Sequence, residues 1–195
     1  MTWVVMPAAG QGERVGGPVP KQYLPLLGHA LILHSLDAVL SHPVVDGVVV
    51  ALAARDPHWP GITRRHDKPV LTCVGGNSRA ESVLAGLRAL PDDVAATDPV
   101  LVHDAARPCL QRNDLTRLLA AAAGHPVGAL LGAPVRDTLK CAGADREDMG
   151  TQARDGLWRA FTPQLFARGL LTDALAQALD AGVAVTDEAM AIERL

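Results

Sequence analysis

Short apolar runs alternate with amphipathic segments along most of this chain. The runs are rich in valine, and unbroken hydrophobicity over a few residues is typical of strands that are buried on both faces. Strands are therefore predicted at residues 2–6, 46–52, 69–74, 99–103 and 127–132.

Helical spacing of apolar side chains fills most of the gaps between these runs. Ser78 followed by Glu81 is the signature of a capping box. Asn113 is a candidate N-cap, and Gly182 is a candidate helix end. The alternation of strands and helices favours one α/β domain over residues 1–195, with a mostly parallel sheet covered by helices on both faces. Helices are predicted at residues 31–41, 78–90, 113–123 and 164–181.

Residues 133–162 interrupt this alternation, because they show no helical period. Two strands are predicted at residues 135–140 and 155–162, with polar residues 142–152 between them as the tip of an arm that spans about 134–160. A hairpin that projects from such a domain cannot bury both of its faces on its own core. We therefore expect the arm to pack on a second copy of the chain, which predicts a homodimer.

The composition of the chain mainly excludes some classes of partner and site. The formal net charge is −3, so no overall basic field attracts nucleic acid, and an anion must be bound locally. Three cysteines at wide, irregular spacing match neither a disulfide framework nor a zinc site, and they favour reduced thiols. The sequence shows no signal-peptide pattern and no run of about 18 apolar residues. We therefore expect a cytoplasmic protein that binds neither membrane nor nucleic acid.

A glycine-rich loop at residues 7–23 follows the first predicted strand and contains the cations Arg14 and Lys21. Open α/β sheets bind ligands at the carboxyl ends of their strands. Glycines there let backbone N–H groups approach an anion, and both cations can contact phosphate oxygens. The loop is neither a dinucleotide fingerprint nor a P-loop, and a plain turn is the alternative. We expect a polyphosphate cradle that uses Gly10, Gly12, Gly16 and Gly17.

Two further loops are expected at the same edge of the sheet. In residues 73–82, Gly75 and Gly76 precede a predicted helix start, and Asn77 or Ser82 is suited to bind a base or ribose. A glycine turn followed by ordinary helix capping is the alternative.

The second of these loops, residues 101–108, places Asp104 at the end of a buried strand and Arg107 three positions later. Mg²⁺ is commonly held by one carboxylate together with substrate phosphates, and an arginine suits an anionic group. An aspartate used for capping or in an ion pair is the alternative.

Seven motifs occur in one order along the chain, and together they are far more specific than any of them alone. They are P-A-A-G-x-G-x-R-x-G at 7–16, P-K-Q at 20–22, G-G-x-x-R-x-x-S at 75–82, H-D-A-A-R-P at 103–108, R-D-T at 136–138, R-x-G-L-W-x-x-x-T-P-Q at 154–164 and T-D-E-A at 186–189. Over its whole length the chain closely resembles the 2-C-methyl-D-erythritol 4-phosphate cytidylyltransferase family.

The resemblance implies a Rossmann-like nucleotidyltransferase fold and a homodimer joined by the arm. It implies the reaction of CTP with 2-C-methyl-D-erythritol 4-phosphate, giving 4-diphosphocytidyl-2-C-methyl-D-erythritol and pyrophosphate in isoprenoid precursor synthesis.

The resemblance also assigns roles to residues by motif. Nucleotide contacts would come from Pro7, Ala8, Ala9, Gly10, Gly12, Gly75, Gly76, Asn77 and Ser82. The catalytic residues would be Arg14, Lys21 and Arg154, and Asp104 would bind Mg²⁺. The acceptor would be surrounded by Asp104, Arg107, Thr138, Arg154 and Thr186, with Thr138 and Arg154 supplied by the arm of the other subunit.

The sequence departs from the family pattern at two places. It ends at Leu195, where the family is expected to continue through a D-N-x-K-[VI]-T motif whose lysine helps to position the acceptor phosphate. Asn77 stands where an acidic residue also occurs, and either side chain can meet the amino group of cytosine. Two other functions stay open: a cytidylyltransferase for ribitol 5-phosphate or a similar polyol phosphate, and a non-catalytic nucleotide-binding or dimer-scaffold protein.

Overall fold

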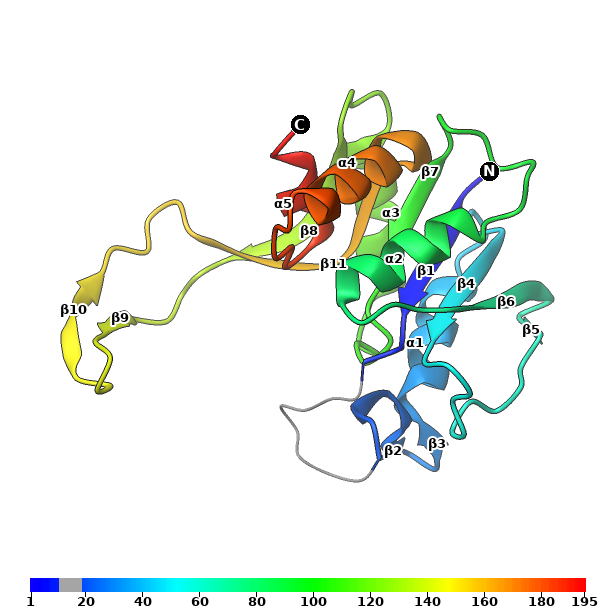
Figure 1. The fold of residues 1–195 in the computed structure, drawn as a ribbon, viewed down its shortest axis with the longest axis horizontal. Helices are drawn as coiled ribbons and strands as arrows, with labels where there is room; N and C mark the ends of the chain where they lie inside the picture. Colours follow the sequence, from blue (N-terminus) through cyan, green and yellow to red (C-terminus); the bar gives the residue numbers. More distant parts are fainter. Residues whose placement is uncertain (11–18) are drawn as a thin grey trace.

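A seven-stranded, mostly parallel sheet forms the body of the protein (Figure 1). The structure is a computed structural model of the chain, and it describes residues 1–10 and 19–195. The sheet order is β5-β6-β4-β1-β7-β11-β8, which confirms the predicted α/β class. The strands are β1 (Trp3–Pro7), β2 (Pro25–Leu26), β3 (His29–Ala30), β4 (Gly47–Leu52), β5 (Arg64–Arg65), β6 (Lys68–Val74), β7 (Pro99–Val102), β8 (Gly128–Pro134), β9 (Leu139–Ala142), β10 (Asp148–Gln152) and β11 (Trp158–Ala167).

Strand β1 lies at the centre of the parallel part of the sheet. It pairs in parallel with β4 on one side, where Trp3 is opposite Gly47, and with β7 on the other, where Trp3 is opposite Val100. Strand β6 pairs in parallel with β4, so the chain adds strands on one side of β1 and then crosses to the other side with β7. In open α/β sheets, ligands bind at such a reversal of strand order, outside the carboxyl ends of the strands.

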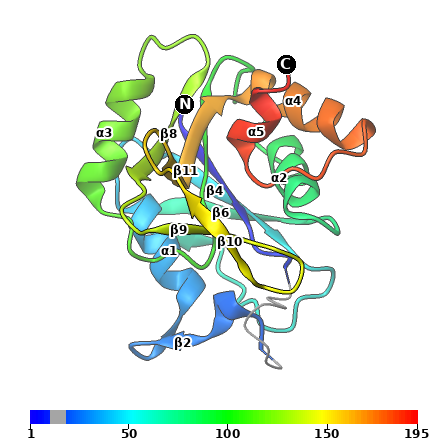
Figure 2. The ribbon, with the colours of Figure 1, turned by 90° about the vertical axis from the view of Figure 1, so that its left-hand side faces the viewer.

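Helices cover both faces of the sheet, as the alternation predicted (Figure 2). Side chains of β1 alternate between the two cores because strand residues point to opposite faces in turn. Val4 and Met6 pack in the core beneath α1 and α3, whereas Trp3 and Val5 pack in the core beneath α2 and α4. The helices are α1 (Leu31–Leu40), α2 (Arg79–Arg88), α3 (Arg112–Ala122), α4 (Arg168–Asp180) and α5 (Glu188–Ile192), with a 3₁₀ turn η1 (Lys21–Tyr23). None of the helices described over residues 1–10 and 19–195 could cross a bilayer.

Two predicted helix starts are wrong. Helix α3 begins at Arg112 after Gln111, so Asn113 lies inside its first turn rather than at the N-cap. The predicted helix 164–181 begins only at Arg168, because the residues before it extend β11. Leu165 and Phe166 pack in different cores on the two faces of the sheet, which is the arrangement of a strand.

The arm projects from the body where β8 and β11 leave the sheet (Figure 1). Its tip is a hairpin of β9 and β10, which pair only with each other. The predicted strand 155–162 overlaps β11 from Trp158 onward, but the predicted strand 135–140 overlaps β9 only at Leu139 and Lys140, and β10 falls inside the segment predicted to be the loop. Every residue of β10 is exposed, so its sequence carries no alternation of apolar and polar positions that could reveal the strand.

Helix α2 approaches β1 closely because Gly86 has no side chain at their contact. A Cβ at Gly86 would lie 2.5 Å from Cγ1 of Val5, a fully buried residue with a branched, stiff side chain. Because α2 begins at the carboxyl edge of the sheet, this contact helps to set the distance between the helix start and the end of β1.

We expect Gly86→Ala to lower the free energy of unfolding by about 1 to 2 kcal/mol, because overpacking a core costs about 1–3 kcal/mol. An ordinary helix glycine would instead gain about 1 kcal/mol from the same change. In a Val5→Ala background the substitution should be stabilising, since the space is then free. Urea unfolding of the four proteins in this double-mutant cycle measures the coupling. A Gly86→Ala protein that is more stable than the wild type would contradict the packing.

Candidate functional site

A cavity of about 430 Å³ opens at the carboxyl ends of β1, β6 and β7. The three loops that were expected to meet at this edge of the sheet all contribute to its wall. The lining residues are Pro7, Ala8, Ala9, Gly10, Lys21, Gln22, Gly76, Asn77, Ser78, Arg79, Ser82, Asp104, Ala105 and Ala106.

Gln22 fixes the part of the wall that follows β1. Its buried side-chain amide donates to the carbonyl oxygens of Ala8 at 2.7 Å and Gly10 at 3.0 Å. These bonds join η1 to the end of β1, and they place Lys21 beside the loop backbone. Gly10 does not have a positive φ, and a Cβ there would meet nothing within 4 Å, so neither conformation nor packing requires glycine at this position among the described residues. Gln22 belongs to the P-K-Q motif, but no role was predicted for it.

The second part of the wall is the turn between β6 and α2. Gly75 is required for close packing, because a Cβ there would lie 2.7 Å from Cβ of Ala9 and 2.8 Å from Oγ of Ser82. The Ser82 hydroxyl donates to the carbonyl of Ser78 at 2.9 Å and accepts from the N–H of Gly76 at 3.2 Å. Ser78 also forms the predicted capping box with Glu81. The capping function proposed as the alternative is therefore present, and Asn77 lies between these fixed points on the cavity wall.

Asp104 is held between two arginines. Its Oδ1 accepts from Nε of Arg79 at 3.1 Å and from Nη2 at 3.0 Å, and its Oδ2 accepts from Nε of Arg107 at 2.9 Å. Burial alone would raise the pKa of the Asp104 carboxyl, but the two guanidiniums outweigh it and hold that pKa below its ordinary value. Asp104 is therefore an ionised carboxylate on the cavity wall, and the ion pair named as an alternative exists.

His103 and Thr162 join the loop after β7 to strand β11. Nε2 of His103 lies 3.0 Å from the carbonyl oxygen of Arg107, and Nδ1 lies 3.1 Å from Oγ1 of Thr162. Because a carbonyl only accepts, Nε2 carries the proton and Nδ1 accepts from the threonine, whose oxygen also accepts from the N–H of Asp104 at 3.2 Å. Burial lowers the pKa of His103 to about 4, so the ring stays neutral and the backbone of Asp104 is fixed.

The T-D-E-A motif reaches the same region from the end of the chain. Glu188 accepts from Nη2 of Arg79 at 3.1 Å and also from Nη1. Gln164 donates to Asp187 at 2.9 Å and accepts from the N–H of Ala189 at 2.9 Å. The roles of Arg79, Glu188 and Gln164 were not predicted, since contacts across 109 or 25 positions leave no local pattern in a sequence.

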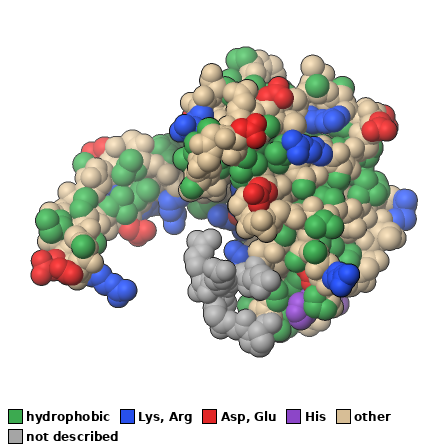
Figure 3. Space-filling model, in the orientation of Figure 1, with side chains coloured by type: hydrophobic (Ala, Val, Ile, Leu, Met, Phe, Trp, Pro, Cys, Tyr) green, Lys and Arg blue, Asp and Glu red, His purple; other side chains and the backbone are tan. Residues whose placement is uncertain are grey.

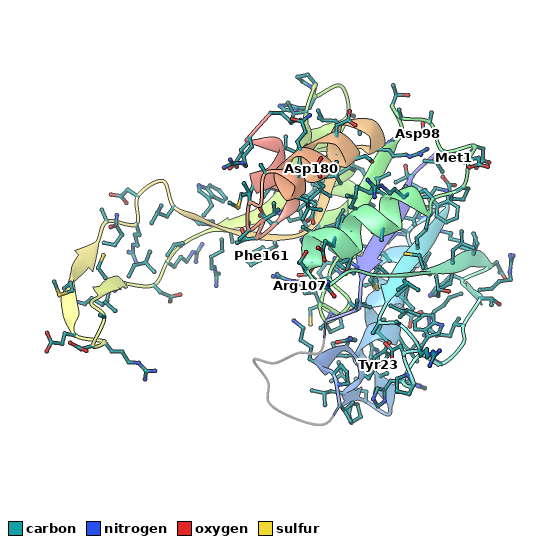
Figure 4. All side chains as sticks on the ribbon, in the orientation of Figure 1. Met1, Tyr23, Asp98, Arg107, Phe161 and Asp180 are labelled. Carbon is teal, nitrogen blue, oxygen red and sulfur yellow. The ribbon has the colours of Figure 1, made fainter. Side chains whose placement is uncertain are left out.

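Several predicted site residues lie away from the cavity. Thr138 and Arg154 are on the arm, where Arg154 donates to the carbonyl of Arg136, and Thr186 is exposed just before α5. Arg107 lies beside the cavity next to Phe161 at the root of the arm, and its Cζ is 6.0 Å from the ring centre (Figure 4). Gly12, Gly16, Gly17 and Arg14 fall outside the described residues.

Cationic side chains line the recess between the arm and the body (Figure 3). Because the net charge of the protein is −3, an anion was predicted to need a local group of cations. The cationic side chains of this recess form such a group.

The donor set at Asp104 fits a magnesium ion only in combination with a substrate. Asp104 supplies the one carboxylate among the described residues that line the cavity. Within residues 1–10 and 19–195, no group of three His, Cys, Asp or Glu side chains could hold a metal by itself. One carboxylate plus phosphates and water is nevertheless a common way of holding Mg²⁺.

Comparison with known proteins gives the same result over nearly the full chain. A family model described as 2-C-methyl-D-erythritol 4-phosphate cytidylyltransferase matches residues 2–195. The protein of that name from Xanthomonas campestris pv. campestris (strain 8004) is 62% identical over 193 residues, which are 99% of this chain and 73% of that protein. The one from Stenotrophomonas maltophilia (strain R551-3) is 59% identical over 192 residues, 98% of this chain and 83% of that protein.

A solved structure extends the likeness to three dimensions. The crystal structure of the Francisella tularensis 2-C-methyl-D-erythritol 4-phosphate cytidylyltransferase has a TM-score of 0.83 at 32% identity, over 99% of this chain and 85% of that one. The family-model match over residues 2–195 includes all seven motifs that suggested the resemblance. The chain therefore belongs to the 2-C-methyl-D-erythritol 4-phosphate cytidylyltransferase family of nucleotidyltransferases.

Proposed function

We propose that the chain transfers the cytidylyl group of CTP to 2-C-methyl-D-erythritol 4-phosphate, with release of pyrophosphate, in the cavity at the carboxyl edge of the sheet. The observation that carries this proposal is the convergence there of a loop backbone, a lysine and an ionised carboxylate, namely residues 8–10, Lys21 and Asp104. The three cysteines of the protein are free, which fits the reducing cytoplasm, and we place the enzyme there.

The chemistry needs no strong base. The attacking atom is an oxygen of a phosphate monoester, which is largely ionised at neutral pH because its second pKa is about 6. The difficulty lies in bringing two anions together and in stabilising charge that grows on the α-phosphate and on the leaving pyrophosphate. A cavity wall with a lysine and an arginine-held carboxylate suits that task.

Each wall of the cavity takes one part of the substrates. The backbone of residues 8–10 and of residues 75–77 binds cytosine, and Ser82 lies near the ribose. Lys21, together with Arg14, contacts the phosphates and stabilises the transition state. Asp104 is the residue that would hold Mg²⁺, and the ion would supply charge neutralisation on the triphosphate when bound.

The acceptor is bound between two subunits in this proposal. Arg107 and Thr186 contact it from one subunit, and Thr138 of the partner subunit and Arg154 of the partner subunit contact it from the arm. The arm supports a homodimer because a two-stranded hairpin is at best marginally stable alone, and Trp158 at its root is 65% exposed. A second copy of the chain that packs on the arm would stabilise the hairpin and would also cover Trp158.

The first test is pyrophosphate release with defined substrates. We expect turnover with CTP and 2-C-methyl-D-erythritol 4-phosphate, and much less with ribitol 5-phosphate as acceptor. UTP, ATP and GTP should be poor donors, because a backbone wall reads the edge of cytosine and a purine is too large. Preference for ribitol 5-phosphate or for a purine nucleotide would refute the substrate assignment. Binding of CTP without pyrophosphate release would indicate a non-catalytic protein.

Lys21→Ala should lower kcat by about 100-fold to 1000-fold, the usual effect of removing one donor that stabilises charge in the transition state. The fold should survive, because the Lys21 side chain lies on an exposed turn. Arg88→Ala is the matched control, since Arg88 is an exposed cation at the far end of α2. Steady-state kinetics and thermal unfolding of both variants measure the effect; near-normal turnover of Lys21→Ala would remove this residue from the reaction.

Subunit mixing tests whether the site is shared. Lys21→Ala and Arg154→Ala proteins should each be nearly inactive, and Arg154→Ala should bind CTP normally. In a mixed dimer, one of the two sites regains both residues, so a freely exchanged mixture should recover about a quarter of wild-type activity. Mass spectrometry of the native dimers verifies the exchange. Verified mixed dimers without activity would show that each site is built within one chain.

A further inference from the structure

Arg79 connects three segments that are far apart in the sequence. It is the first residue of α2, and it contacts Asp104 after β7 and Glu188 at the start of α5. Nε and Nη2 donate to Oδ1 of Asp104 at 3.1 and 3.0 Å, whereas Nη1 and Nη2 donate to the two oxygens of Glu188. Four of the five guanidinium N–H groups are thus given to carboxylates, which leaves Arg79 little capacity to bind a substrate.

Stability does not explain this arrangement. The side chain of Glu188 is 1% exposed, and that of Arg79 is 28% exposed on the cavity wall. Removal of two charges from water is costly, and a buried ion pair can often be replaced by apolar residues without loss of stability. The arrangement is better explained by what it positions, because a planar guanidinium fixes the orientation of each carboxylate that it contacts.

The segment that carries Glu188 is itself held in place by hydrogen bonds. Asp187 caps α5 by accepting from the N–H of Met190 at 3.0 Å, and it also accepts from Gln164 of β11. Glu188 therefore sits on a segment that is anchored to the sheet, and it can serve as a fixed support for Arg79. The same segment carries Thr186, which is assigned above to the acceptor.

We propose that Arg79 is a positioning residue, whose guanidinium is aligned by Glu188 and in turn orients the Asp104 carboxylate for a divalent cation bound with the nucleotide. Both contacts from Arg79 go to Oδ1 of Asp104, so Oδ2, which accepts one bond from Arg107, keeps a lone pair for the cation. The inference rests on the proposed function for the identity of the nucleotide.

The test measures CTP binding by calorimetry, once with excess Mg²⁺ and once with EDTA. Arg79→Lys keeps the charge but cannot contact both carboxylates in one plane, and Glu188→Gln keeps the shape but loses the charge that aligns Arg79. In both variants we expect CTP affinity in EDTA to stay near the wild-type value. The gain in affinity on adding Mg²⁺ should shrink by about 10-fold to 100-fold, which is the usual effect of changing a residue that supports a metal ligand.

Two exposed residues on the same helices or beside them provide controls. Arg88→Lys and Glu193→Gln make the same chemical changes away from the cavity, and both should keep the full Mg²⁺ effect. The double variant Arg79→Lys with Glu188→Gln should lose no more than Arg79→Lys alone, because the pair acts as one unit. Thermal unfolding confirms that each variant is folded at the assay temperature, and Glu188→Gln alone decides the matter if Arg79→Lys does not fold.

The outcomes separate this inference from the proposed function. A wild-type protein that fails to bind CTP overturns the proposed function and this inference with it. A wild-type protein that binds CTP equally with and without Mg²⁺ overturns this inference and the metal role of Asp104, and it leaves the proposed transfer to the pyrophosphate assay. A wild-type protein with a clear Mg²⁺ effect that is equally large in Arg79→Lys and Glu188→Gln overturns the positioning role alone. Loss of CTP affinity in EDTA would instead make Arg79 a direct nucleotide ligand and would equally refute it.

Discussion

The simultaneous pairing of β1 with β4 and β7 is the constraint on which the rest of the structure depends. Two parallel ladders fix both edges of β1, and buried side chains fix both of its faces. A slip by one residue would exchange the two faces, moving Val4 into the core that now holds Trp3 and Val5. Because the register is so strongly determined, the loops after β1, β6 and β7 arrive at one edge in a defined relation to each other. The cavity is a consequence of that relation.

The polar side chains around the cavity mostly hold other parts of the protein. Gln22 binds backbone carbonyls on the loop after β1, and Gln164 binds Asp187 and the backbone of Ala189. Both glutamines are nearly fully buried, so their polar atoms need partners, and those partners lie just after β1 and at the start of α5. Several motifs that look catalytic in the sequence thus supply the framework that positions a few reactive groups.

The sequence was sufficient where the structure is local or periodic. Strands β1, β4, β6 and β7 were predicted to within one residue at each end, and the capping box at Ser78 was found because its two residues stand three positions apart. Prediction failed at residues 164–167, where Leu165 and Phe166 continue the apolar pattern of the following helix and only their burial on opposite faces identifies a strand.

The least predictable part of the site was the set of long-range polar contacts. Arg79 and Glu188 were both visible within motifs, but their partnership depends on how α2 and α5 pack on the same face of the sheet. Composition and spacing carry no information about such a contact. The alternative explanation of Asp104 as an ion-paired residue was likewise open until Arg79 and Arg107 were seen on either side of it.

Strand β11 has a consequence for how this chain can vary during evolution. Its pairing with β8 is interrupted between Ala160 and Gln164, and Thr162 lies inside that interruption. The tip hairpin, residues 139–152, pairs only with itself, so insertions or deletions there leave every sheet register unchanged. The gain or loss of a single residue at 161–163 would turn the side chains beyond it to the opposite face. Natural variation in length is therefore expected to gather at the tip of the arm, while its root stays constant in length.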